Sequence, residues 1–313
     1  MISKEEFVQR CDALIPKEEI EKYNKCRKKM WTTLIITLIV EALILFGLCC
    51  LWNIVIYLVP FVVIISILIV VLNLKYNWGD FKKKYHKPVM DILFEGYEYY
   101  FQQEKYINEN VFKSSCFNAN YDRYSGEDFL CVKIPNDDGS ASDVLLSLCD
   151  LRVTKQETVE YSSRDSNGNR VTRKETRTKI VYGGTFGYVN FPFQFKCDLS
   201  INVNHKWHKK IKLEDEKFNK ACKVYTDNQL EALVILTPTL MNKIKSFVSR
   251  INSFKICLMK NGSMYFGMSR DMFELAKSSR KPTGIVFETF YDDVVDVLAM
   301  INEIKDNNKV FKM

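Results

Sequence analysis

The amino-acid sequence predicts an α+β protein, with an N-terminal two-helix transmembrane hairpin followed by a cytosolic, mostly antiparallel α+β domain. Two observations carry this expectation. The stretch 31–74 is almost continuously apolar, and Glu41 is its only Asp, Glu, Lys or Arg. The rest of the chain mixes short β-like runs with helical periodicity, a pattern typical of the α+β class. With 47% hydrophobic and 27% charged residues over 313 positions, a wholly disordered chain is excluded.

The apolar stretch divides into two runs, 31–52 and 54–74, of 22 and 21 residues with Asn53 between them. A bilayer core of about 30 Å is crossed by roughly 20 apolar helical residues, so the runs predict two spanning helices. Cationic residues flank the pair outside and are missing from the turn, which predicts a multi-pass protein of the cell membrane with both termini cytoplasmic. The expected lipid contacts are Lys28, Lys29, Lys82, Lys83, Lys84, Trp31, Trp52 and Trp78.

Glu41 is the strongest candidate for a functional residue in this segment. A carboxylate at mid-bilayer depth costs several kcal/mol, about 2.5–3.5 on insertion scales, unless it is paired, hydrated or protonated. A functional role would be an intramembrane oligomer contact or proton-linked site. The plainer role is a protonated Glu bonded to a neighbouring hydroxyl such as that of Thr37, or to a second copy of the chain. Pro60, in the second run, is either a hinge or a tolerated kink.

Four segments organise the chain: a cytosolic helical segment over 1–30, the hairpin, a juxtamembrane helix within 75–110, and the cytosolic domain over 111–313. Ser3 and Glu6 have the spacing of a capping box, which predicts a helix start. Apolar residues at helical spacing after the basic run FKKK predict the juxtamembrane helix.

Within the domain, turn residues between alternating runs predict three antiparallel pairs. The runs 129–134 and 144–148 flank NDDG, and a longer ribbon joins 151–161 to 170–181 across SNGN. Asn261-Gly262 predicts a hairpin with a type I′ turn. Helices are expected near 239–252 and 289–305. The cysteines beyond residue 110 have no paired spacing, which favours free thiols in a reducing compartment.

No motif predicts a catalytic residue, a cofactor or a metal. His205 and His208 form His-x-x-His, but zinc needs further ligands and lysines surround the pair. Asp122, Glu127 and Asp128 could form a carboxylate site, although turn formation is the default interpretation. Gly183, Gly184 and Gly187 match no phosphate-binding loop and are better explained by close packing of strand backbones. The aromatic residues assigned to the core or to a partner groove are Tyr121, Tyr124, Tyr188, Phe191, Phe193 and Phe195.

Basic residues gather at 205–212 and along the ribbon. They could contact anionic lipid, although charged strands also defend an exposed edge against pairing. The modest charge excess, +7 for the whole chain, disfavours nucleic acid. The ribbon cations are Arg164, Arg170, Arg173, Lys174, Arg177 and Lys179.

Several segments in order resemble the DUF3137 family of membrane-anchored proteins of unknown function. They are FKKKYHKPVM after the hairpin, NANYDRYSGEDFL at 118–130, YGGTFGYVNF at 182–191, KLEDEKFNKACKVYTDNQLEALVILTPTLMNKI at 212–244 and GSMYFGMSRDMFE at 262–274. The resemblance covers roughly 80 to 280 and the paired spans. It implies a membrane-tethered cytoplasmic domain and transfers no catalytic residue.

The sequence therefore favours a membrane-anchored, non-enzymatic protein that presents an interaction domain at the inner leaflet, with a protein partner, a second copy of the chain or anionic lipid as its ligand. Two alternatives stay open. One is a subunit of an oligomeric channel or transporter with Glu41 in the membrane, and the other is a membrane-bound enzyme with an unrecognised site. A pocket holding convergent polar groups would favour the enzyme.

Overall fold

The computed structural model of the protein describes residues 1–16, 18, 19, 21, 32, 35, 36, 39, 82–117, 119–135, 143–164, 170–203, 209–251, 253–274 and 283–307. The chain divides into two compact units. The first unit comprises Met1, Phe94–Leu275 and Thr289–Met313, and the second comprises Ile2–Leu93 and Ala276–Glu288.

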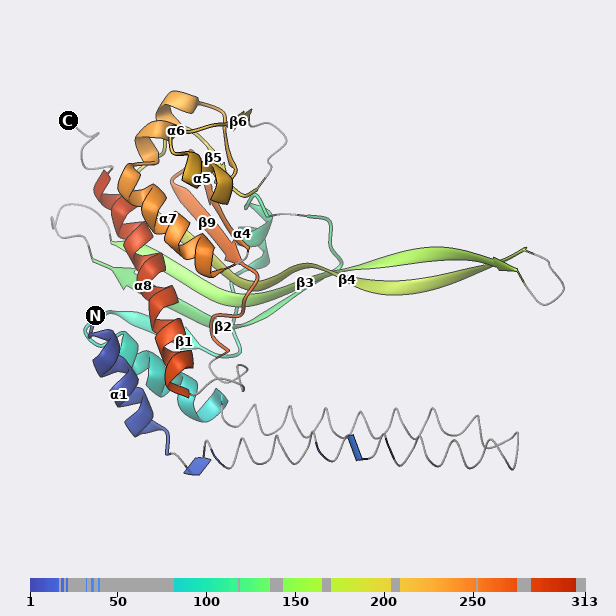
Figure 1. Ribbon diagram of the computed structural model, residues 1–313, viewed down its shortest axis with the longest axis horizontal. Coiled ribbons are helices and arrows are strands. Elements are labelled where there is room, and N and C mark those ends of the chain that lie inside the picture. The colour runs from blue at the N-terminus through green and yellow to red at the C-terminus, as the bar shows by residue number, and fades with distance from the viewer. Residues whose placement is uncertain are drawn as a thin grey trace. The chain divides into compact units, whose positions relative to one another are not determined.

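A nine-stranded sheet of order β1-β2-β3-β4-β9-β8-β5-β7-β6 organises the described part of the first unit (Figure 1). Its recorded strand pairs are all antiparallel, which confirms the mixed α+β domain with an antiparallel sheet. The strands are β1 (Tyr99–Gln102), β2 (Arg123–Ile134), β3 (Val144–Arg164), β4 (Arg170–Asn190), β5 (Leu199–Ile201), β6 (Lys209–Ile211), β7 (Val224–Thr226), β8 (Phe254–Leu258) and β9 (Ser263–Met268).

The first unit also holds α4 (Glu109–Lys113), α5 (Glu216–Ala221), α6 (Gln229–Ile235), α7 (Pro238–Arg250) and the part of α8 (Thr283–Asn307) from Thr289 on. Polar side chains cap α4, α5, α6 and α7: each accepts a hydrogen bond from a first-turn amide, the usual stabilisation of a helix start. These caps are Asn108, Asp215, Asn228 and Thr237.

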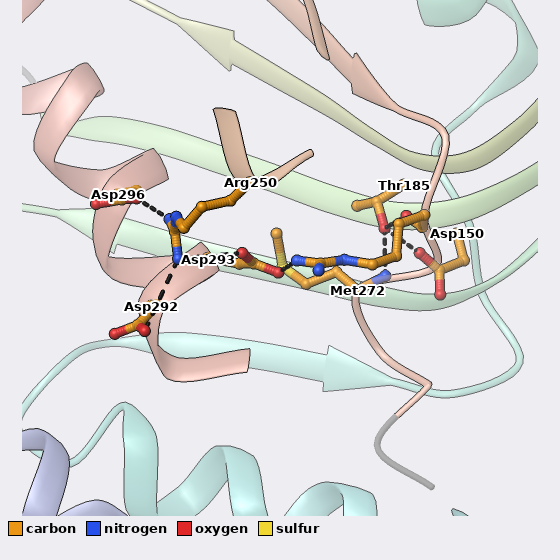
Figure 2. A network of polar contacts seen from close by, with 8 residues as sticks. Asp150, Thr185, Arg250, Met272, Asp292, Asp293 and Asp296 are labelled. Carbon is orange, nitrogen blue, oxygen red and sulfur yellow. Dashed lines mark hydrogen bonds and ion pairs between the residues drawn. The ribbon is translucent and has the colours of Figure 1, made fainter. Parts of the chain in front are cut away.

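Helices cover both faces of the sheet. On one face, Phe247 of α7 packs edge-on against Phe254 of β8 with ring centroids 4.5 Å apart. On the other face, Phe112 of α4 is fully buried and lies 5.3 Å from Phe186 of β4. Cys149 and Phe186 belong to the core cluster around Phe112 on the α4 face. Since strand side chains alternate between faces, their neighbours Asp150 and Thr185 point to the α7 and α8 side (Figure 2).

A disulfide joins Cys116, just after α4, to Cys257 of β8, and it lies at the buried core of the α4 face. The two cysteines are 141 positions apart, so no local spacing in the sequence indicates the pair. The expectation of free thiols is corrected for these two residues. It holds for the buried Cys149, Cys197 and Cys222.

The second unit begins with α1 (Lys4–Leu14), capped as the sequence predicts by Ser3, whose hydroxyl accepts a 3.2 Å bond from the Glu6 amide. The Phe7 ring of α1 meets Phe287 edge-on, with centroids 6.4 Å apart. Residues 82–93 form a further helix. It ends before Gly96, and Tyr99–Gln102 are strand β1, so the helix expected within 75–110 is shorter than that range.

None of the helices among the residues described above is both long enough and apolar enough to cross a membrane. The long helix α8 has 25 residues, but Asp292, Asp293 and Asp296 interrupt it, whereas a span needs roughly 20 predominantly apolar residues. The predicted transmembrane hairpin and the multi-pass membrane localisation are therefore corrected. The two predicted runs, with Glu41 and Pro60, lie outside the described residues except for Thr32, Ile35, Ile36 and Ile39.

The β8–β9 hairpin forms where Asn261-Gly262 predicts it, but with a different turn. A type I′ turn needs positive φ at both central residues, and here only Gly262, at φ 86°, has it. The Gly262 amide donates to the Met259 carbonyl at 2.9 Å, and the Met259 amide donates to the Ser263 carbonyl at 2.8 Å. This is the longer loop in which a type I turn is followed by a left-handed glycine.

Candidate functional site

The outer halves of β3 and β4 form a two-stranded ribbon, defined here as residues 154–164 and 170–180. Figure 1 shows the ribbon, in green, leaving the sheet as a long arm. Strand β2 pairs with β3 only as far as Arg123 opposite Thr154, and β9 pairs with β4 only from Phe186 on. Asp122 continues the contact with this edge of β3 as far as Gln156, because its amide donates to the Thr154 carbonyl and its carboxylate accepts from the Gln156 amide. Beyond these points the described strands show no further pairing, so the rest of the ribbon presents both faces and both outer edges.

The cross-strand register assigns the ribbon side chains to two faces. We call one of them the charged face, because it carries mostly charged side chains and one aromatic ring. We call the other the hydroxyl face, because it carries mostly Thr and Ser. The charged face holds Lys155, Glu157, Val159, Tyr161, Glu175, Arg177 and Lys179. The hydroxyl face holds Thr154, Gln156, Thr158, Glu160, Ser162, Thr172, Lys174, Thr176, Thr178 and Ile180.

Acidic and basic side chains are mixed along the charged face and form ion pairs. Glu157 lies 3.5 Å from Lys179, and Glu175 lies 3.1 Å from Arg177. The Arg177 guanidinium also lies 5.1 Å from the centroid of the Tyr161 ring. The hydrogen bond to Glu175 raises the pKa of Arg177 further above its ordinary value. Exposed pairs of this kind contribute little to stability, so they leave the side chains available to another surface.

A β-bulge separates the ribbon from the sheet. Val153 pairs with Tyr182 and Thr154 pairs with Ile180, which leaves Val181 as the extra residue. Close to this bulge, Gly184 has φ 126°, and a Cβ there would overlap the Met268 carbonyl oxygen. A glycine is required because it alone allows β4 to pass this close to the segment 268–270. The expectation of close backbone packing is confirmed at this glycine.

Thr185 follows the glycine and is the centre of a buried polar network (Figure 2). Its side chain is fully buried, and its hydroxyl donates to the Asp150 carboxylate on β3 and accepts a 2.7 Å bond from the Met272 amide. The Thr185 amide donates to the Arg270 carbonyl at 3.0 Å. One side chain therefore joins both ribbon strands to the segment 269–274.

The network continues from this segment into two helices. The Arg270 guanidinium pairs with Asp293 of α8. Arg250, at the end of α7, pairs with Asp296 and lies 3.8 Å from Asp292 and 3.9 Å from Asp293 (Figure 2). Burial lowers the pKa of Arg270, and the charge of Arg250 acts in the same direction. The root of the ribbon is thereby fixed to α7 and α8 by directional contacts, the kind that hold a binding element in one orientation.

The three acidic residues considered as a carboxylate site, with turn formation as the default interpretation, have different environments. Asp122 accepts a 2.6 Å bond from the Gln156 amide and so ties β3 to the chain before β2. Asp128 is buried at a bulge of β2 with φ 62°, and its amide donates to the Gln103 carbonyl at 2.8 Å. Glu127 is exposed. In the described parts of the chain, no three His, Cys, Asp or Glu side chains are placed to hold a metal ion.

The predicted aromatic residues mainly build the core. Tyr124 lies 5.6 Å from Phe112, and its hydroxyl donates to the Ile107 carbonyl at 2.7 Å. Burial raises the pKa of Tyr124, and burial together with a bond to Glu109 raises the pKa of Tyr121 to about 12. Tyr188 packs against the α4-face cluster, while Phe191, Phe193 and Phe195 pack on one another with centroids 5.1 to 5.5 Å apart.

The expected lipid-contact residues are mostly not among those the structure describes. Of the three basic residues at 82–84, Lys82 is 3% exposed, Lys84 pairs with Glu19, and Lys83 is exposed. The lipid contacts of these residues stay a prediction. The predicted site residues that the structure does not describe are Lys28, Lys29, Trp31, Glu41, Trp52, Trp78, His205 and His208.

Sequence reasoning missed the polar network, although one signal for it exists. Leu146, Leu148 and Asp150 occupy successive positions on the same face of β3, and the third is a buried carboxylate where a core residue is expected. A polar residue that interrupts the apolar face of a strand indicates a buried partner. The partner Thr185 is 35 positions away, so the pattern identifies one end of the contact only.

The sheet, the flanking helices and the ribbon define an α+β domain with a projecting antiparallel arm. Residues 180–308 match the family model described as "Protein of unknown function (DUF3137)". The resemblance inferred from the sequence is confirmed over these residues, which run from the root of the ribbon to the end of α8. No curated protein and no solved structure matches the chain.

Proposed function

We propose that this protein is a non-enzymatic interaction module whose ribbon binds a partner protein with an acidic surface. The observation that carries the proposal is the ribbon itself, a charged two-stranded arm with open edges whose root is fixed by the buried network around Thr185. An isolated hairpin is marginally stable in water, and this arm packs little of its surface on its own domain. Its side chains are therefore better explained by a surface outside the chain.

Two features of the ribbon support a protein partner. Tyr and Arg are enriched where binding energy concentrates in protein interfaces, and Tyr161 and Arg177 stack on the charged face. The open edges of β3 and β4 offer backbone donors and acceptors to a strand of a partner, the mode known as β-augmentation. Side chains on the two faces would then select the partner.

The charge pattern argues for an acidic protein rather than a polyanion. The ribbon and its tip, residues 154–180, contain seven Lys or Arg and four Asp or Glu, an excess of three cations. Nucleic acid is held by cations that follow a regular row of phosphates. Here Glu157 and Glu175 stand among the cations of the charged face. A protein surface can match such an alternating pattern, whereas a uniform row of phosphates cannot.

Site-directed photo-cross-linking in the native host cell tests the proposal. A benzophenone amino acid replaces Tyr161 on the charged face, and the matched control carries it at Lys217, which is exposed on α5. We expect one discrete protein adduct from position 161 and none of that mass from position 217. Arg177→Glu in the same chain should reduce the adduct about tenfold, because a cation at an interface centre often contributes more than 1 kcal/mol.

The negative outcomes are distinct. Equal adducts from positions 161 and 217 would refute a specific arm. An adduct that disappears on nuclease or lipase treatment would replace the protein partner with nucleic acid or lipid. An adduct unaffected by Arg177→Glu would remove the charged face from the interaction.

A further inference from the structure

A cavity of about 370 Å³ lies in the first unit, between the last turns of α8 and the end of β2. Apolar side chains of Ile134, Val295 and Leu298 form much of its wall. Asn302 and Lys305 of α8 add polar groups. This volume is in the range of small-molecule sites, and the wall combines apolar side chains with a cation, an amide and a carboxylate. The cavity is separate from the ribbon.

Lys305 gives the cavity its chemical character. Its side chain is only 5% exposed, and its ammonium donates a 3.0 Å bond to the Pro135 carbonyl. An ammonium has three donors, so one neutral acceptor leaves two of them available. In the described part of the chain, no carboxylate pairs with it. A buried charge without a counter-charge is costly, and a bound anion would remove that cost.

The rim of the cavity restricts the kind of anion. Asp306 lines the same cavity and is exposed, so its charge opposes a dianion more strongly than a monoanion. Ile134, Val295 and Leu298 offer contacts to a hydrocarbon body rather than to a second polar group. The Asn302 amide could donate to a carboxylate bound by Lys305.

From this geometry we propose that the cavity is a binding site for a small monocarboxylate with an apolar body, with Lys305 as the group that recognises its carboxylate. The two remaining ammonium donors take the carboxylate oxygens, and the apolar wall takes the hydrocarbon. This proposal does not depend on the ribbon or on its partner.

Calorimetric titration of the full chain with octanoate tests the site, with octanol and octyl phosphate as a neutral and a dianionic ligand of equal chain length. Octanoate should bind at least about tenfold more tightly than octanol, because a charge-assisted hydrogen bond is worth at least that factor. Octyl phosphate should bind more weakly than octanoate, and Asp306→Asn should narrow that gap.

Lys305→Met keeps about the length of the apolar stem of the side chain and removes the ammonium. It should weaken octanoate about tenfold or more and leave octanol unchanged, while Lys217→Met, on exposed α5, should change neither. Replacing a buried charge by an apolar group is often neutral or stabilising, so the variant should fold. Its thermal midpoint, measured without ligand, should therefore be no lower than that of the wild type.

Three results would overturn the proposal: equal affinity for octanoate and octanol, wild-type affinity for octanoate in Lys305→Met, or no octanoate binding at millimolar concentration. If Lys305→Met does not fold, Ala299→Leu decides instead, since it narrows the cavity without removing the charge. Loss of octanoate binding in that variant supports the site, and unchanged binding refutes it.

Discussion

Replacing Thr185 with Val should loosen the root of the ribbon while leaving the shape of the side chain almost unchanged. The substitution removes the hydroxyl that donates to Asp150 and that accepts the 2.7 Å bond from the Met272 amide. The site is fully buried, so water cannot replace either bond. Both partners keep their polar atoms in the interior.

The expected loss in the free energy of unfolding follows from these two hydrogen bonds. A hydrogen bond to a charged group contributes about 1.5–3 kcal/mol, and a buried amide left without its acceptor costs about 1–3 kcal/mol. Because the two losses share one hydroxyl and partly relax together, we expect a destabilisation of about 3 kcal/mol. For a unit of this size that lowers the thermal midpoint by roughly 6–12 °C.

Thr178→Val is the matched control. Thr178 is on the hydroxyl face of the ribbon and exposed, so the same atoms change without burial. Its effect should stay within about 0.5 kcal/mol. Thermal unfolding followed by circular dichroism compares the two variants, and hydrogen exchange of residues 269–274 reports whether the root has opened. If Thr185→Val and Thr178→Val shift the midpoint equally, the network does not hold the ribbon.

Three further predictions concern the same domain. Gly184→Ala should cost about 3 kcal/mol in thermal unfolding, because it adds backbone strain to an overlap with the Met268 carbonyl. The control Gly96→Ala should cost only about 1 kcal/mol, because Gly96 also has a positive φ, 83°, but has open space around it. Equal costs for the two variants would contradict the close approach of β4 to Met268. Phe112→Ala should cost about 3–5 kcal/mol in chemical denaturation, since a fully buried ring leaves a cavity, and a loss under about 1 kcal/mol would mean that α4 is not part of the core. The bond from Lys243 lowers the pKa of Glu303, so its stabilisation is present above the ordinary value of 4.5 and is lost as pH falls through the lowered pKa. Glu303→Gln should therefore be about 0.5 kcal/mol less stable at neutral pH and equal to the wild type in acid, and a difference that persists in acid would exclude this cause.

Local patterns predict the strands well because a hairpin is specified by neighbouring residues. NDDG, SNGN and Asn261-Gly262 each lie between two runs that pair in the structure. The type I′ turn predicted at Asn261-Gly262 is wrong, because the loop has one residue more than the two-residue loop that this turn type closes. The membrane hairpin predicted from hydropathy alone is contradicted, because no helix among the described residues meets the length and apolarity of a span.

The polar contacts that fix the ribbon are beyond local reasoning. The Met272 amide and the Thr185 hydroxyl are 87 positions apart, and Cys116 and Cys257 are 141 positions apart. A single sequence holds no periodic signal for such pairs, since each partner alone resembles an ordinary polar or small buried residue. Their pairing depends on the order of strands in the sheet, which brings β3, β4 and β9 side by side.

Shortening the ribbon gives the most direct test of its role. Lys155 and Lys179 lie opposite each other, so Asn-Gly in place of residues 156–178 should close the strands with a tight turn and leave the sheet and its network intact. With the partner identified by cross-linking at position 161, the affinity of the shortened chain is compared with that of the full chain. We expect an unchanged fold and an affinity at least about a hundredfold lower, the loss expected when a group of interface anchors is removed. A shortened chain that folds and binds the partner as tightly as the full chain would contradict the interaction role of the ribbon.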